Sequence, residues 1–232
     1  MSAGAAVLIA LLQSNVPAFG SHYAGKQFFD ARQSEIAPSA TAHCEGDERV
    51  SGQRAAAGPL RVVPFSPQEA KPYDFPHDVF HVLLSRNGRA HKVADVEASY
   101  GTCDVYAVDL DGDQEPEVVV ESGLGRGTSA YVRMLEIFKR RPQGYERVFY
   151  ALLSGYVPVN DGDPDAWERS YSFKKADGPA SVVLHLRLGP RSSVWADADA
   201  LDALHFPVRE YCWRTTPGAY RLCHFEYTTV EK

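Results

Sequence analysis

Residues 79–96 read VFHVLLSRNGRAHKVADV, and this stretch decides the fold class. The apolar run VFHVLL precedes Asn87-Gly88, and the run AHKVADV follows shortly after it. Asn-Gly is the dipeptide that most strongly favours a two-residue turn between antiparallel strands, because both of its residues accept a positive φ. The stretch therefore predicts a β-hairpin.

Short β-rich runs continue from this hairpin to the C-terminus, separated by turns rich in Gly, Pro and Asp. They are expected at 105–110, 117–121, 131–139, 145–153, 170–174, 181–188, 209–215 and 220–229. This spacing is typical of an all-β domain in which antiparallel hairpins form a propeller-like sheet stack or a sandwich. The best helix candidate, 197–204 (DADALDAL), is short, so we expect little helix. Strands do not alternate with helices, which argues against a parallel α/β enzyme fold.

The composition is that of a globular protein without a nucleic-acid partner. Of the 232 residues, 44% are hydrophobic and 23% are charged, which excludes disorder throughout the chain. The net charge is −6. A nucleic-acid binder needs a basic face to neutralise phosphates, so we expect none here.

The N-terminus predicts export. The first 25 residues contain no Asp, Glu, Lys or Arg, and 5–12 (AAVLIALL) are apolar. This run is shorter than the about 20 residues that span a membrane, but it matches the core of a secretory signal, with small residues at Ala18 and Gly20 before a cleavage site. A buried N-terminal helix is the alternative. We predict a signal peptide over 1–20, a partly disordered arm or linker over 21–76 with a possible short strand at Leu60–Phe65, and an all-β domain over 77–232. After cleavage no transmembrane segment would remain.

Four cysteines support an oxidising compartment. Pairing Thr215 with Tyr220 across a turn places Cys212 directly opposite Cys223, within reach of a disulfide. Cys44 and Cys103 then pair by elimination. No spacing indicates zinc, and four reduced, buried thiols are the alternative. An even cysteine count after an apolar leader favours a periplasmic or extracellular location.

The most specific motif is the acidic loop 109–117, DLDGDQEPE. Side-chain carboxylates stand at alternate positions, and Glu115 can offer its main-chain carbonyl. Calcium takes about six to eight oxygens, and a tight loop can supply them from alternate residues. The loop therefore predicts a Ca²⁺ site, with an ion-free acidic turn as the alternative.

The stretch 105–148, which contains DLDGDQEPEVVV, a glycine-rich turn and MLEIFKRRPQGYERV, resembles one repeat of the FG-GAP and VCBS-type β-propeller proteins, the family of the integrin α-subunit headpiece. The resemblance implies side-chain calcium ligands at Asp109, Asp111, Asp113 and Glu117 and a main-chain ligand at Glu115. Gln114 stands where the family usually has Gly, so it must accept a positive φ or the loop must shift. Glu117 replaces the usual Asp. A second acidic cluster, 160–168 (NDGDPDAWE), is expected to be a solvated turn.

The sequence does not name a substrate. No GxSxG motif occurs, and the aromatic residues are expected mainly in the core. We expect a secreted or periplasmic, calcium-stabilised, non-catalytic domain that binds a protein or a glycan. A small secreted hydrolase and a periplasmic inhibitor or immunity-type protein are the alternatives. A deep pocket joining a histidine to a carboxylate or hydroxyl would favour the hydrolase, and a flat aromatic rim would favour binding.

Overall fold

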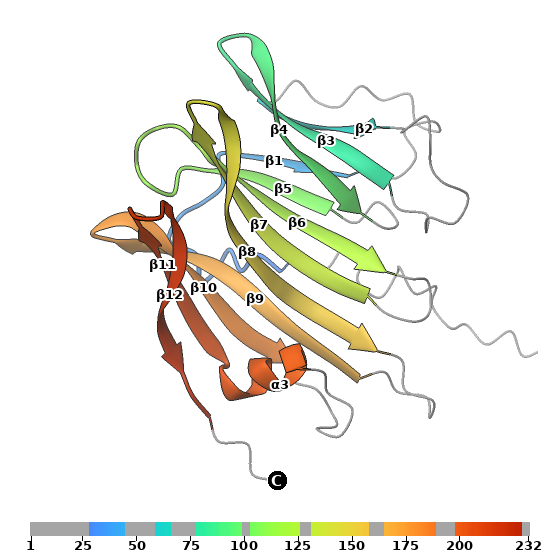
Figure 1. Ribbon diagram of the computed structural model, residues 1–232, viewed down its shortest axis with the longest axis vertical. Helices are drawn as coiled ribbons and strands as arrows, with labels where there is room; N and C mark the ends of the chain where they lie inside the picture. The colour runs from blue at the N-terminus through green and yellow to red at the C-terminus, as the bar shows by residue number, and fades with distance from the viewer. Residues whose placement is uncertain are drawn as a thin grey trace, which may run out of the picture.

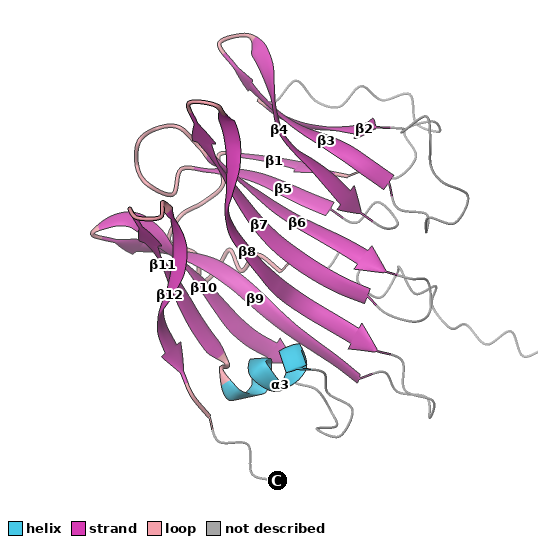
Figure 2. Ribbon diagram, in the orientation of Figure 1, coloured by secondary structure: helices cyan, strands magenta, loops and turns pink. Residues whose placement is uncertain are grey.

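A computed structural model of the chain describes residues 28–44, 59–65, 78–98, 103–125, 131–157, 165–188 and 198–228. The expected signal peptide over 1–20 lies outside these residues. The described elements are β1 (Ala40–His43), β2 (Leu60–Phe65), β3 (Asp78–Arg86), β4 (Arg89–Ala98), β5 (Cys103–Val108), β6 (Glu117–Gly125), β7 (Tyr131–Arg141), β8 (Gly144–Val157), β9 (Asp165–Ala176), β10 (Gly178–Leu188), α3 (Ala198–His205), β11 (Val208–Arg214) and β12 (Ala219–Glu226). Figures 1 and 2 show these strands and the single described helix.

The strands form two antiparallel sheets, which confirms the all-β prediction. Nine strands follow the order β1-β5-β6-β7-β8-β9-β10-β11-β12, and the other three follow β2-β3-β4. The hairpin of β3 and β4 turns at Asn87 and Gly88, whose φ values of 48° and 75° are those that the Asn-Gly turn requires. The predicted helix is present as α3, and Leu60–Phe65 forms β2. None of the described residues forms a helix long and apolar enough to cross a membrane.

The nine-stranded sheet is buried on both faces where β5 and β6 lie. Val118 and Val120 pack in one core toward the three-stranded sheet, and Val119 packs in the core on the opposite face. All three side chains are fully buried. A strand covered on both faces has a continuous apolar run rather than an alternating one, which explains the sequence VVV. Burial of each such side chain stabilises the fold by about 1.5–3 kcal/mol.

In the nine-stranded sheet, β9 pairs with only a short part of β8. The strand β8 pairs with β7 along nearly its whole length, from Gly144 to Tyr156, but with β9 only over Ser154–Val157. Residues 28–36 occupy the edge of β9 that β8 leaves: Phe29 bridges Tyr171, and the amide of Glu35 donates to the carbonyl of Phe173. Phe28 is buried in the core. This part of the expected arm is therefore packed against the sheet.

Both predicted disulfides are present. Cys44 and Cys103 have Cα atoms 5.0 Å apart, and Cys212 and Cys223 have Cα atoms 5.7 Å apart. Disulfides persist in oxidising compartments, so the two bridges indicate a protein that folds outside the cytoplasm.

The predicted register of the second bridge was wrong. Cys212 lies opposite Arg221, not opposite Cys223, because the turn closes one residue earlier, with Arg214 opposite Ala219. A register shift between Glu210 and Tyr211 follows, and the bridge joins the strands diagonally.

Candidate functional site

The acidic loop joins β5 to β6, and its carboxylates accept hydrogen bonds from amides of the same loop. The carboxylate of Asp109 accepts hydrogen bonds from the amides of Gly112, at 2.8 Å, and Gln114, at 3.1 Å. The second carboxylate oxygen of Glu117 accepts from the amide of Leu110 at 2.8 Å. Gln114 has a φ of 69°, so the residue that replaces glycine does adopt the left-handed conformation. These bonds fix the loop between the ends of two buried strands.

Three of the predicted ligands converge, and a lysine lies among them. Carboxylate oxygens of Asp109, Asp111 and Glu117 all lie within 4.8 Å of one another. Lys139 of β7 donates from Nζ to Asp111 Oδ2 and to Glu117 Oε1, at 2.5 Å in each case. The same ammonium is 3.7 Å from Asp113 Oδ2. The oxygens expected to face calcium therefore face an ammonium group.

Burial and ion pairing oppose each other at this cluster. Burial raises the pKa of Glu117, while the hydrogen bond from Lys139 acts to lower that pKa. Burial alone would lower the pKa of Lys139, but its hydrogen bonds to Asp111 and Glu117 outweigh this and hold the pKa above its ordinary value. Lys139 is thus a permanent cation at physiological pH.

Asp113, a further predicted ligand, accepts at Oδ1 from the amide of Glu115 at 2.7 Å. Glu115, which is predicted to ligate through its main-chain carbonyl, has its side chain directed to two arginines. Its carboxylate pairs with Arg86 and lies 3.3 Å from Arg140. Calcium needs about six to eight oxygens around one point, and two of the expected carboxylates already bond Lys139. The residues as they lie do not fit a calcium ion beside the ammonium. Calcium binding at this loop stays a prediction from the sequence.

The second acidic cluster is only partly described, and its last residues belong to a strand. Asp161 and Asp163 lie outside the described residues. Trp167 and Glu168 lie in β9 and are buried, not solvated as expected. The reason is that Trp167 packs against Ala203 of α3.

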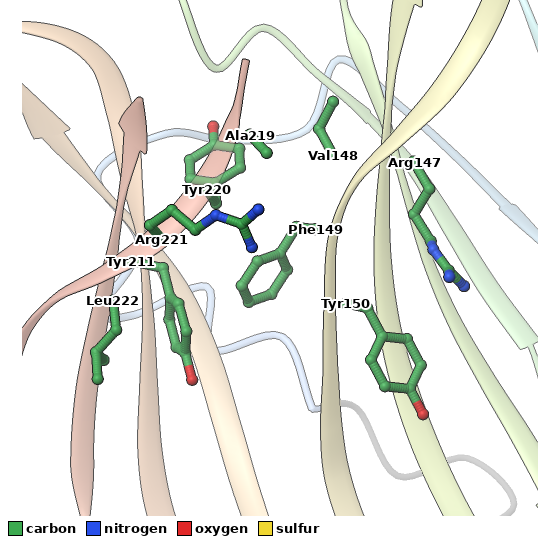
Figure 3. A pocket seen from close by; sticks show the side chains of 9 residues that line it. All are labelled: Arg147, Val148, Phe149, Tyr150, Tyr211, Ala219, Tyr220, Arg221 and Leu222. Carbon is green, nitrogen blue, oxygen red and sulfur yellow. The ribbon is translucent and has the colours of Figure 1, made fainter. Parts of the chain in front are cut away.

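A cleft of about 340 Å³ lies between β8 and β12 (Figure 3). Its lining comprises Arg147, Val148, Phe149, Tyr150, Tyr211, Ala219, Tyr220, Arg221 and Leu222. Four consecutive residues come from β8 and four from β12. Because side chains alternate between the faces of a strand, a consecutive run along a cleft means that the main-chain edge of the strand also borders it.

The cleft is aromatic and positively charged. Phe149 is a buried lining residue, and its ring centroid lies 5.0 Å from that of Tyr211 and 5.9 Å from that of Tyr220. Arg147 lies over Tyr150 and pairs with Glu136 at 2.5 Å. Figure 3 shows the guanidinium of Arg221 directed over Phe149.

The cleft therefore carries one uncompensated positive charge. Arg221 is exposed and has no ion pair within the described ranges. Within the part of the chain that the structure describes, no acidic residue lines the cleft.

The groups that would assemble a hydrolase are not gathered at this cleft. The described residues that line it include no histidine, serine, cysteine or carboxylate. Elsewhere in the described residues, histidine ring nitrogens bond to Asp104, Asp95 and the carbonyl of Thr228. Ser181 donates to Glu210 at 2.6 Å. A histidine that bonds a carboxylate but no nucleophile does not activate one.

A buried ionic cluster lies on the core face of the nine-stranded sheet. Arg133 of β7 donates to Asp104 at 2.7 Å and to Glu121 at 3.3 Å. Arg133 and Glu121 have side chains exposed by only 2% and 0%. The guanidinium stacks over the ring of Phe28, 5.2 Å from its centroid. This cluster fastens the N-terminal segment to the sheet and is structural.

Sequence reasoning missed Lys139 and the cleft. The pairing of Val118 with Phe138, continued by one residue, places Lys139 directly opposite Glu117, a relation that can be recognised once the strands are aligned. No sequence feature indicates the residue at which β9 stops pairing with β8. The resemblance to calcium-loop repeats likewise rests on the motif alone. In comparisons with known proteins, this chain matches no family, no curated protein and no solved structure.

Proposed function

We propose that this protein is a secreted or periplasmic, non-catalytic binding domain that takes an extended, acidic segment of a partner protein into the cleft between β8 and β12. The two disulfides support a location outside the cytoplasm. Among the described residues that line the cleft there is no histidine, serine, cysteine or carboxylate, which supports binding over catalysis. The proposal does not require calcium.

The unpaired edge of β12 is the reason to propose a partner in an extended conformation. This strand ends the order of the nine-stranded sheet, so one of its edges has no strand partner within the described ranges. Such an edge presents free N–H and C=O groups, to which an extended peptide can add as a further strand. Leu222 and Phe225 on β12 are 46% and 48% exposed, and burial of these side chains under a partner adds apolar stabilisation.

The positive charge of the cleft is the reason to propose an acidic partner. Arg221 presents a guanidinium to a cleft without carboxylates, and this group matches a partner Asp or Glu through two parallel hydrogen bonds. Hot spots in protein interfaces are enriched in Tyr and Arg surrounded by groups that exclude water. The observation that carries the proposal is that consecutive residues of an edge strand line the cleft beside this unpaired arginine.

The test measures fluorescence anisotropy of a fluorescein-labelled Val-Glu repeat peptide of eight residues, the length of β12. A Val-Lys repeat of equal length controls for charge. A Val-Glu peptide with N-methylated alternate amides controls for strand addition. We expect binding by the Val-Glu peptide alone, because the other two lose the pairing with Arg221 or the main-chain hydrogen bonds.

Arg221→Ala should weaken this binding by about 10- to 100-fold, since a charge-assisted hydrogen bond contributes about 1.5–3 kcal/mol. Arg214→Ala, an equal loss of charge at an exposed end of β11, should leave the affinity unchanged. Equal binding of all three peptides, or an equal effect of both variants, would refute the proposal. Binding of oligogalacturonate but not of the Val-Glu peptide would assign the cleft to an acidic glycan instead.

A further inference from the structure

The acidic loop has one cation within it, and that cation belongs to the chain. Lys139 Nζ contacts Asp111 and Glu117 at 2.5 Å each, with Asp113 at 3.7 Å. Its side chain is 14% exposed, and that of Glu117 is 3% exposed. Two hydrogen bonds from a shielded ammonium to two carboxylates form a closed ionic cluster, unlike a solvated surface pair.

The remaining carboxylates of the loop are satisfied without a metal. Asp109 accepts two main-chain amides, and Glu115 pairs with Arg86 and Arg140. The repulsion among the acidic residues, which is the physical reason to expect a dication, is therefore relieved by three cationic side chains and by the amides of the loop.

Lys139 also lies beside an aromatic ring of the β11–β12 hairpin. Its ammonium lies 6.0 Å from the centroid of the Trp213 ring on β11, a distance at which a cation is attracted to an aromatic face. Trp213 packs edge-on against Tyr220 at 5.4 Å. The ammonium thus connects the acidic loop to the β11–β12 hairpin.

We propose that Lys139 is the resident cation of this loop: its ammonium takes the place in which the sequence motif predicts calcium, the loop closes without a metal, and a divalent cation enters only when the ammonium is removed. The proposal is independent of the partner proposed for the cleft. Without Lys139, the oxygens of Asp109, Asp111 and Glu117 would remain within reach of one point. Carboxylates with no counter-charge are the ligands that a hard cation such as Ca²⁺ binds.

The experiment compares wild type with K139M, using the full chain with both disulfides formed. The matched control is K92M, because Lys92 also bonds a carboxylate, Asp95 at 2.9 Å, but at an exposed position. Thermal unfolding is recorded in chelator and in calcium. We expect calcium to leave the melting temperature of wild type unchanged, and likewise that of K92M. K139M should melt lower in chelator and gain about 3–6 °C when calcium is about ten times its dissociation constant.

A direct titration keeps the test decisive if K139M does not fold. Calorimetric titration of wild type with about 1 mM CaCl₂, a concentration within the range of extracellular calcium sites, should show no binding heat. Calcium binding by wild type at this concentration would overturn the proposal. A folded K139M that neither binds calcium nor is stabilised by it would overturn it as well.

Discussion

Replacement of Arg133 by methionine removes the guanidinium that pairs with the buried Glu121, so it tests how the core of the nine-stranded sheet is held together. Arg133 and Glu121 are exposed by 2% and 0%. Breaking such a pair from one side costs about 3–5 kcal/mol, because the remaining carboxylate is left buried without a counter-charge. Each kcal/mol corresponds to about 2–4 °C for a domain of this size. We therefore expect R133M to melt about 6–20 °C below wild type.

The pH dependence of the stability loss in R133M tests whether the buried Glu121 carboxylate causes it. Burial raises the pKa of Glu121 and the charge of Arg133 acts to lower that pKa, so R133M should raise it further. The folded pKa then lies above the unfolded value of about 4.3. The folded state favours the protonated carboxyl, so this contribution to stability is fully present below the unfolded value and is lost as the pH rises through the folded pKa. The difference between R133M and wild type should therefore be largest at neutral pH and shrink toward pH 5.

The assay is urea unfolding followed by tryptophan fluorescence at several pH values. Arg147→Met is the control, because Arg147 is 54% exposed and its pair with Glu136 should contribute no more than about 1 kcal/mol. The double variant R133M/Glu121→Gln should recover most of the loss, since no buried charge remains. A cost below about 1 kcal/mol for R133M, or a cost that does not change with pH, would refute the reasoning.

Two further predictions concern the scaffold. Replacing both cysteines of the Cys212–Cys223 bridge by serine should cost about 3 kcal/mol of unfolding free energy and the same change at Cys44–Cys103 about 4 kcal/mol, because the second bridge closes the longer loop; equal urea midpoints for both variants would contradict this order. Gly155→Ala should cost about 1–3 kcal/mol, since its Cβ would lie 2.5 Å from Nε1 of the buried Trp167 on the paired strand and one of the two must shift; an unchanged melting temperature would contradict this.

Features decided by neighbouring residues were predictable from the sequence. The β3–β4 hairpin follows from Asn87-Gly88, and α3 follows from the repeating Asp-Ala-Leu pattern. The strand run 145–153 marked β8, but the strand extends to Val157. The positive φ at Gln114 is one of the two outcomes that the loop motif allowed, the other being a shifted loop.

Features decided by distant residues were not predictable. The packing of Phe28 and Phe29 in the core has no periodic signal, because the segment around them is polar and irregular. The wrong register at Cys212 came from pairing Thr215 with Tyr220 at the turn, whereas Arg214 lies opposite Ala219. The cation at the acidic loop was sought outside the chain, although Lys139 lies 22 residues after Glu117. Only the paired strands bring these two residues together.

The central claim is that an acidic, extended segment adds to the edge of β12, and amide hydrogen exchange tests it most directly. Exchange is followed in wild type with and without saturating Val-Glu peptide. We expect slower exchange for the amides of β12 around Arg221 and Leu222, because the added strand protects the edge. The exchange of β4, which lies in the other sheet, should stay unchanged. Unaltered exchange along β12 while the peptide is bound would contradict the account.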